Sequence, residues 1–179
     1  MAHLELGAEL GEGSSGVVYL ARNRLTLRLY AVKSFSKAKL LSKPGKLQLR
    51  YLQRERETLR LIQRRLRGDP CAALLMRYVC SGQDARFLRL VMPACLGGEL
   101  WGLLYEMGAL LDSEVRFYAG CLVLALQKLH SIGVVYRDLK PENVLLTADG
   151  WPIIADFGLS SVSAALDESS LFSLCGTPE

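Results

Sequence analysis

The sequence predicts an α+β fold with two lobes, because strand patterns and helix patterns gather in different halves of the chain. Residues 4–33, and the pair 74–80 and 86–92, alternate apolar and polar side chains or are rich in strand formers. A proline and a glycine pair interrupt this pattern, and the spacing beyond them is mostly helical. We therefore expect an antiparallel-sheet lobe with one helix at 1–92, a hinge at 93–98 and a mostly helical lobe at 99–179.

The strands of the first lobe lie on both sides of a glycine cluster. Leu4, Leu6 and Leu10 alternate loosely with polar residues before the glycines, and Val17–Leu20 follow them. The run Leu25–Val32 alternates again and is rich in strand formers. A Ser-Lys-Pro-Gly sequence at 42–45 separates these strands from the next element.

A helix should follow, and its apolar stripe has the spacing of three and four residues that marks a core-facing side. The stripe is formed by Leu52, Leu59, Ile62 and Leu66. Glu55 falls inside this stripe, whereas Glu57 lies well round the helix from it. Because burying a lone carboxylate is costly, Glu55 requires a cationic partner.

The second lobe begins with a long helical pattern between Ser113 and His130, followed by Gly133. Apolar residues lie almost all round this helix, so we expect it to be covered on most sides. Two short strands, at 144–146 and 152–155, should flank the turn at 148–150.

Composition favours an ordered globular protein. The 179 residues are 50% apolar and 22% charged, which argues against disorder. Much of the net charge of +4 comes from residues 22–67, where no aromatic interleaving suggests stacking on bases. We interpret this basic run as a solvated helix face near an anionic ligand, and we expect no nucleic-acid partner.

The five cysteines form no CxxC pair, which argues against a zinc site. Their odd number and apolar surroundings favour reduced, buried thiols in a cytosolic protein. The sequence shows no leader pattern and no apolar stretch long enough to cross a membrane. We therefore expect a cytoplasmic protein without a membrane span.

Residues 11–18 match the glycine-rich pattern GxGxxGxV, whose loop positions are Gly11, Glu12, Gly13, Ser14, Ser15 and Gly16. Dinucleotide-binding folds use a similar string, but there a helix follows the glycines, and here the strand-like Val17–Leu20 follows. A glycine loop between two strands can fold over phosphates because its backbone approaches closely. Taken alone, the pattern is equally consistent with a simple turn.

Lys33 ends the Ala-Val-Lys sequence of the next strand. At this distance from the glycine loop a lysine can reach the α- and β-phosphates of a nucleotide, and Glu55 can hold it there. The pairing would also supply the partner that the position of Glu55 demands. The alternatives are a solvated lysine and an ordinary salt bridge on a helix surface.

The strongest pattern is Tyr-Arg-Asp-Leu-Lys-Pro-Glu-Asn at 136–143, which matches a phosphotransfer loop with Tyr136 where histidine is commoner. In this pattern Asp138 accepts the proton of the substrate hydroxyl and Lys140 balances the charge of the γ-phosphate. Asn143 and Asp156, the latter in Asp-Phe-Gly, supply oxygen ligands for magnesium. A chance coincidence of these motifs in this order is remote.

Together these residues resemble the eukaryotic protein kinases over essentially the whole chain. Residues 136–143 and the Cys-Gly-Thr-Pro-Glu at 175–179 resemble the group that contains the cyclic-nucleotide-dependent kinases. Residues 94–101 are particularly similar to the cGMP-dependent kinases. The resemblance implies a serine/threonine protein kinase that uses ATP and Mg²⁺.

The resemblance also implies how a nucleotide would be held. Val18, Ala31 and Leu145 would sandwich the adenine, with Met92 as gatekeeper. The Pro93 carbonyl and the Cys95 amide would bind the adenine edge. Glu99 would bind ribose and, with Glu142, would attract basic residues before the target Ser or Thr of a protein or peptide substrate. Plain solvated surface is the alternative for both glutamates.

Ser173 has the place, two residues before Cys175, where the family carries a regulatory phosphosite, and Arg137 could pair with its phosphate. Ser169 and Ser170 compete for this role. The family pattern continues past Glu179, so the resemblance implies an incomplete second lobe that ends inside the activation segment. We expect these residues alone to be inactive, with regulatory domains or a regulatory subunit outside them. A catalytically silent nucleotide-binding or interaction module is the alternative.

Overall fold

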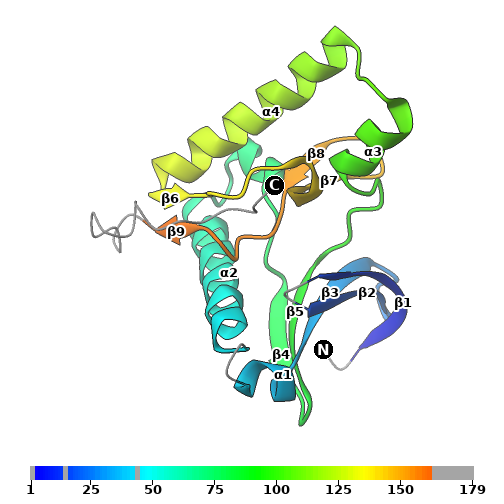
Figure 1. Cartoon of the computed structure of the whole chain (residues 1–179), viewed down its shortest axis with the longest axis vertical. Helices are drawn as coiled ribbons and strands as arrows, with labels where there is room; N and C mark the ends of the chain where they lie inside the picture. The colour runs from blue at the N-terminus through cyan, green and yellow to red at the C-terminus, as the bar shows by residue number, and fades with distance from the viewer. Residues whose placement is uncertain (1–2, 14–15, 43–44, 163–179) are drawn as a thin grey trace.

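In the computed structural model, which describes residues 3–13, 16–42 and 45–162, the chain forms a sheet-bearing part and a helical part (Figure 1). Along the chain, the first part contains β1 (Leu4–Gly13), β2 (Gly16–Asn23), β3 (Leu29–Ser36), α1 (Lys37–Leu41), α2 (Gly45–Arg65), η1 (Pro70–Leu74), β4 (Cys80–Gln83) and β5 (Phe87–Pro93). The second part contains α3 (Leu100–Met107), α4 (Asp112–Ser131), β6 (Val134–Val135), η2 (Pro141–Asn143), β7 (Val144–Leu146), β8 (Pro152–Ile154) and β9 (Ser161–Val162). The predicted α+β class is confirmed.

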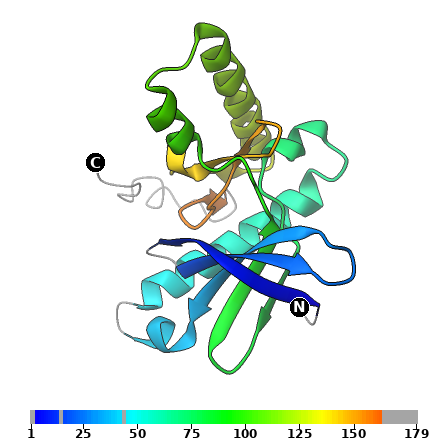
Figure 2. The same cartoon turned by 90° about the vertical axis from the view of Figure 1, so that its right-hand side faces the viewer.

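The sheet has the strand order β1-β2-β3-β5-β4, and every neighbouring pair is antiparallel (Figure 2). Its outer face buries Ala21, Val32 and Val91 in a small cluster. On the inner face, Phe35 and Leu90 join the main core, which extends through α2 into the helical part. Alternation along β3 and β5 therefore places Val32 and Val91 outward and their neighbours toward the core.

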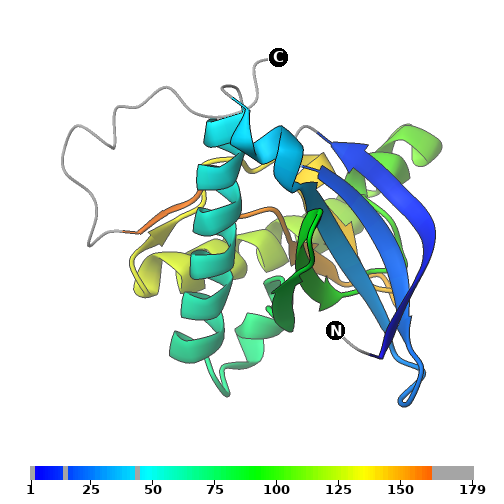
Figure 3. The ribbon, with the colours of Figure 1, turned by 90° about the horizontal axis from the view of Figure 1, so that it is seen from below.

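Helix α2 lies beside the sheet (Figure 3) and presents the predicted stripe to the core. The stripe residues Leu52, Leu59, Ile62 and Leu66 are all buried, and Glu55 within the stripe is only 2% exposed. Glu57 is exposed, as its place on the helix predicts. A short helix that the sequence pattern did not predict, α1, precedes α2 and begins where the Ser36 side chain accepts the Lys39 amide.

Two strand predictions were wrong in part. Residues 25–28 are not the start of a strand but belong to a turn at 24–26 and the two residues after it, because the Asn23 side chain accepts the amides of Leu25 at 2.9 Å and Thr26 at 3.0 Å. The expected strand at 74–80 does not form as such, because η1, with Asp69 as its cap, extends to Leu74. Leu75 then makes an isolated bridge to Ile154, residues 76–79 have no regular structure, and β4 begins only at Cys80. The apolar residues 74–76 are buried by packing against the helical part, so their burial did not require a continuous strand there.

In the helical part, α4 packs against η1 and β8, and its buried side carries Cys121, Ala125 and Leu129. The expected cover on most sides of this helix is not present within the described residues, where the apolar side chains of Val115, Val123 and Leu124 are exposed. The antiparallel pairs β7–β8 and β6–β9 lie beneath it. Within the described ranges, no helix is long and apolar enough to cross a membrane.

The connector after β5 is held against the helical part by backbone hydrogen bonds. The Gly97 amide donates to Leu146 O at 2.9 Å, and the Leu146 amide donates to Gly98 O at 2.8 Å. A Cβ on Gly97 would collide with the Thr147 carbonyl, so this close approach requires glycine. The contact joins β5 to β7 and fixes the floor of the cavity described next.

Candidate active site

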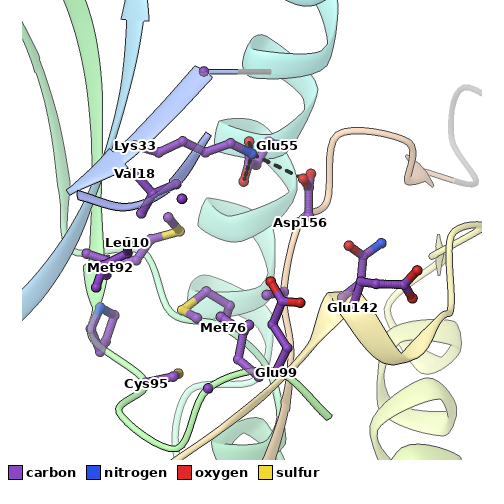
Figure 4. Close-up of a pocket in the computed structure, with 18 of the residues that line it drawn as sticks. Leu10, Val18, Lys33, Glu55, Met76, Met92, Cys95, Glu99, Glu142 and Asp156 are labelled. Atoms are coloured by element: carbon purple, nitrogen blue, oxygen red, sulfur yellow. Dashed lines mark hydrogen bonds and ion pairs between the residues drawn. The ribbon is translucent and has the colours of Figure 1, made fainter. Parts of the chain in front are cut away.

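A cavity of about 390 Å³ lies between the sheet and the helical part, in the size range of small-molecule sites (Figure 4). Both parts contribute to its walls. The lining residues predicted from the sequence are Gly11, Glu12, Gly16, Val18, Ala31, Lys33, Glu55, Met92, Pro93, Cys95, Glu99, Glu142, Asn143, Leu145 and Asp156. Leu10, Met76, Gly98 and Ala155 also line it, although sequence patterns did not single them out for the site.

The β1–β2 hairpin forms the roof of the cavity. Gly13 pairs with Gly16 at the hairpin end, and Ser14 and Ser15 lie outside the described residues. Gly16 has φ of 138°, and a Cβ there would come within 2.6 Å of the Ser34 carbonyl. This position therefore requires glycine, and the hairpin backbone can approach a ligand without a side chain in between.

Lys33, Glu55 and Asp156 form one charged cluster at one end of the cavity (Figure 4). Lys33 Nζ lies 2.9 Å from Glu55 Oε2 and 3.2 Å from Asp156 Oδ2. The Lys33 and Glu55 side chains are 7% and 3% exposed, whereas that of Asp156 is 42% exposed. The contact between Lys33 and Glu55 that we expected is thus present, and the more open Asp156 faces the cavity.

Electrostatics favour the charged forms of Lys33 and Asp156, whereas burial raises the pKa of Glu55 above its ordinary value. Burial alone would lower the pKa of Lys33, but the charges of Glu55 and Asp156 outweigh it and hold that pKa above its ordinary value. Burial also works to raise the pKa of Asp156, yet Lys33 and the Gly158 amide hold it below its ordinary value. At neutral pH the cluster therefore offers an ammonium group and a partly accessible carboxylate side by side.

The loop before η2 places Asp138 and Asn143 together beside the cavity. Asn143 Nδ2 donates to both the backbone oxygen and the Oδ2 of Asp138, each at 2.8 Å. Lys140 Nζ lies 3.8 Å from the same Asp138 oxygen. Asp138 and Lys140 do not line the cavity themselves, but Asn143 does and links them to it. Because the Asn143 side-chain nitrogen donates hydrogen bonds within the loop, the side-chain oxygen is the Asn143 atom suited to bind a cation.

Tyr136, at the position where histidine is commoner, anchors the segment that carries Asp156. Its hydroxyl donates to the Ala155 carbonyl, and its ring meets Phe157 edge-on at 5.3 Å between centroids. Both side chains are almost fully buried. Burial raises the pKa of Tyr136, so this residue stays protonated, whereas a histidine would titrate near neutral pH.

We expect Tyr136→Phe to lower the free energy of unfolding by about 1–3 kcal/mol, because it leaves the buried Ala155 carbonyl without this donor while the ring packing persists. Chemical denaturation measures the change. Tyr78→Phe is the matched control, since Tyr78 is only partly buried and water can replace its hydroxyl. Equal stability of Tyr136→Phe and the wild-type protein would show that the hydroxyl is not an anchor.

The end of the cavity beside the connector is apolar. Ala31 pairs with Met92 across β3 and β5, and Val18 and Leu145 approach from the two parts of the molecule. Burial raises the pKa of the Cys95 thiol, which keeps it neutral. Glu99 and Glu142 line the cavity mouth and are exposed. The cavity thus has an apolar end beside the connector and a charged end at Lys33 and Asp156, which fits a nucleotide with its base at the first and its phosphates at the second.

The charged end of the cavity also fits a magnesium ion that is bound partly by the phosphates of a nucleotide. No cluster of three or more His, Cys, Asp or Glu suited to a metal occurs in the part of the chain that the structure describes. Asp156 and Asn143 nevertheless offer hard oxygen ligands on the same wall, and Mg²⁺ commonly takes one or two protein oxygens together with phosphate oxygens. These residues therefore fit a metal that arrives with a nucleotide.

Comparison with known proteins agrees with this geometry. A family model described as "Protein kinase domain" matches residues 4–179. The cGMP-dependent protein kinase, isozyme 2 forms cD5/T2, of Drosophila melanogaster is 33% identical over 180 aligned residues, which cover 100% of this chain and 18% of the relative. Ribosomal protein S6 kinase alpha-4 of Homo sapiens is 37% identical, with 99% and 22% covered.

The cGMP-dependent protein kinase 2 of Rattus norvegicus is 30% identical, again with 99% of this chain and 22% of the relative covered. The chain therefore spans about a fifth of the length of these curated relatives. The match over residues 4–179 confirms the resemblance predicted from the sequence, and the chain belongs to the protein kinase domain family.

Proposed function

We propose that this protein is a serine/threonine kinase that transfers the γ-phosphoryl group of Mg-ATP to a Ser or Thr hydroxyl in a basic sequence context. The observation that carries the proposal is the cluster of Lys33, Glu55 and Asp156 at one end of a cavity whose other end is apolar. Family membership and relatives that are named kinases support the same activity.

The charged residues divide the phosphate chemistry among them. Lys33, held by Glu55, would bind the α- and β-phosphates. The Asp156 carboxylate and the Asn143 amide oxygen would hold magnesium, which, when bound, neutralises phosphate charge in transfer. Lys140, 3.8 Å from Asp138, would balance charge on the group being transferred.

Asp138 would act on the nucleophile. Its Oδ2 accepts from Asn143, which restrains the rotation of the carboxylate that would receive the proton of an incoming hydroxyl. The phosphorus–oxygen bond to ADP breaks as the bond to the substrate oxygen forms, and the hydroxyl proton passes to Asp138. Positioning and charge stabilisation then account for most of the catalysis.

The apolar end would hold adenine between Val18, Ala31 and Leu145, with Met92 as gatekeeper. The connector residues Pro93 and Cys95 would bind its edge through their backbones. Glu99 at the mouth would bind ribose, and its charge together with that of Glu142 would attract basic substrate residues. The proposal also includes the division of the chain into a first lobe that ends at residue 92, a hinge at 93–98 and a second lobe that begins at residue 99.

The proposal also covers how the protein is regulated and where in the cell it is located. Ser173, with Ser169 and Ser170 as competitors, lies outside the described residues and stays a proposed phosphosite. Regulatory domains or subunits elsewhere would be in keeping with the much longer relatives. A cytoplasmic location is supported by the free thiols of Cys71, Cys80, Cys95 and Cys121, the cysteines in the described residues.

Magnesium-dependent nucleotide binding is the first test. We expect Mg-ATP to bind the protein in calorimetry and Asp156→Asn to weaken this binding about tenfold or more, because a carboxylate ligand is lost. The same replacement at an exposed aspartate outside the cavity, Asp112→Asn, should leave binding unchanged. ATP binding of equal strength with and without magnesium in a folded protein would contradict the assigned metal site.

A further inference from the structure

A pair of buried hydroxyls joins α2 to the segment after Asp156. Thr58 Oγ1 and Ser160 Oγ lie 2.9 Å apart, although the residues are 102 positions apart in the sequence. Both residues are 0% exposed. Buried hydroxyl groups are costly unless they are paired, so this hydrogen bond contributes to the position of both elements.

The direction of the hydrogen bonds follows from the number of protons. The Ser160 hydroxyl donates to the Phe157 carbonyl at 2.7 Å, and the Ser160 amide donates to the same carbonyl at 3.1 Å. Because a hydroxyl carries one proton, Ser160 must accept from Thr58. The result is a continuous chain of donors from the side chain of α2 to the backbone of the Asp-Phe-Gly turn.

This series of hydrogen bonds joins the same two segments as the ion pairs of Lys33 with Glu55 and Asp156. Thr58 lies one helical turn after Glu55 on the buried side of α2, and Phe157 directly follows Asp156. The same two segments are therefore joined twice, once through Lys33 and once through the hydroxyls. From the other side, Arg137 Nε donates to the Leu159 carbonyl at 2.9 Å and holds the same segment.

The two links differ in what a nucleotide would do to them. Lys33 and Asp156 face the cavity, so phosphates and magnesium would compete for the charges that now join them. Neither Thr58 nor Ser160 lines the cavity, and their hydrogen bond would persist with a ligand in place. A hydrogen bond also has a fixed length and direction, whereas apolar side chains alone allow a helix to slide.

We propose that Thr58 and Ser160 are positioning residues, whose hydrogen bond sets the place of α2 against residues 156–160 and so keeps Glu55 and Asp156 aligned on Lys33. The kinetic part of this inference rests on the proposed kinase activity. The structural part, the coupling of α2 to the segment, does not depend on activity and has its own readout.

The variants that test it are Thr58→Val and Ser160→Ala, singly and together, with Thr58→Ser as a variant that retains the hydroxyl. Ser161→Ala is the matched control, because the Ser161 hydroxyl is buried next door without a hydrogen-bond partner in the described structure. If Thr58→Val folds poorly, Ser160→Ala tests the same hydrogen bond by removing its other partner. Thermal unfolding monitors folding in every variant.

In steady-state kinetics we expect Thr58→Val to lower kcat/KM for ATP by about three- to tenfold, the range of one neutral hydrogen bond. Ser160→Ala should lower it at least as much, because it also removes the hydrogen bond to the Phe157 carbonyl. The KM for the peptide substrate should stay unchanged. Thr58→Val should add nothing further in the Ser160→Ala background, since one bond is already lost. Thr58→Ser and Ser161→Ala should stay within twofold of the wild-type protein.

Hydrogen exchange without nucleotide separates the two proposals. We expect faster exchange in both α2 and residues 156–162 for Thr58→Val than for Ser161→Ala. If the wild-type protein transfers no phosphate but this exchange result holds, the proposed function fails and the coupling stands. If the protein is active but Thr58→Val matches Ser161→Ala in both kinetics and exchange, or the two replacements act additively, the positioning role is overturned.

Discussion

Asp138→Asn should lower kcat about 10²- to 10⁴-fold while the KM for ATP changes little, because general-base catalysis contributes on this scale. Asparagine keeps the shape of the side chain and can still contact Asn143 and Lys140, which lie 2.8 Å and 3.8 Å from Asp138 Oδ2. It cannot take up the proton of an attacking hydroxyl. The loss should therefore fall on the chemical step.

Single-turnover measurements on the bound nucleotide check this assignment, since they separate chemistry from binding. Asp149→Asn, in the exposed turn between β7 and β8, is a control of the same chemistry away from the cavity. A kcat within threefold of the wild-type value for Asp138→Asn would remove Asp138 from the role of base.

Lys33→Met should lower kcat/KM for ATP about 10²- to 10³-fold, the scale of losing one preorganised charge contact to a phosphate. Unlike the loss at Asp138, this one should include weaker nucleotide binding. The replacement also leaves Glu55, 2% exposed, without its cation and raises the pKa of Asp156 by removing a cause of its depression. Magnesium binding should then begin to fail at a higher pH than in the wild-type protein.

Calorimetry with Mg-ATP across pH and steady-state kinetics measure these two effects. Lys46→Met provides the control, because Lys46 is an exposed residue of α2 that does not line the cavity. Nucleotide affinity and turnover in Lys33→Met equal to those of Lys46→Met would mean that the buried ammonium serves folding alone.

Much of the fold was predictable because it follows local patterns. The stripe on α2 was predicted with Glu55 inside it, since a 3.6-residue period shows which side of a helix is buried. The errors arose where other interactions override strand propensity. Asn23 folds residues 24–26 into a turn through its side chain, and residues 74–76 bury themselves against the helical part instead of joining a strand.

The residues of the candidate site likewise fall into those that the sequence could predict and those that it could not. Residues that belong to contiguous motifs, such as Gly16 and Asp156, could be placed at the cavity from the sequence. Met76 also lines it, but it belongs to no motif and reaches the cavity only because η1 turns the chain inward. The Thr58–Ser160 contact spans 102 positions, and no periodicity in one sequence relates two residues so far apart.

The central claim is tested most directly by the transfer of labelled γ-phosphate from ATP to a peptide that carries arginine before a serine. With a complete kinase domain, the wild-type protein should label the serine only with magnesium present, and Asp138→Asn should retain Mg-ATP binding but label the peptide at least a hundredfold more slowly. The 179 residues alone should not label it at a useful rate. Tight Mg-ATP binding without any labelling by the complete wild-type domain, or labelling that Asp138→Asn leaves unchanged, would contradict the account.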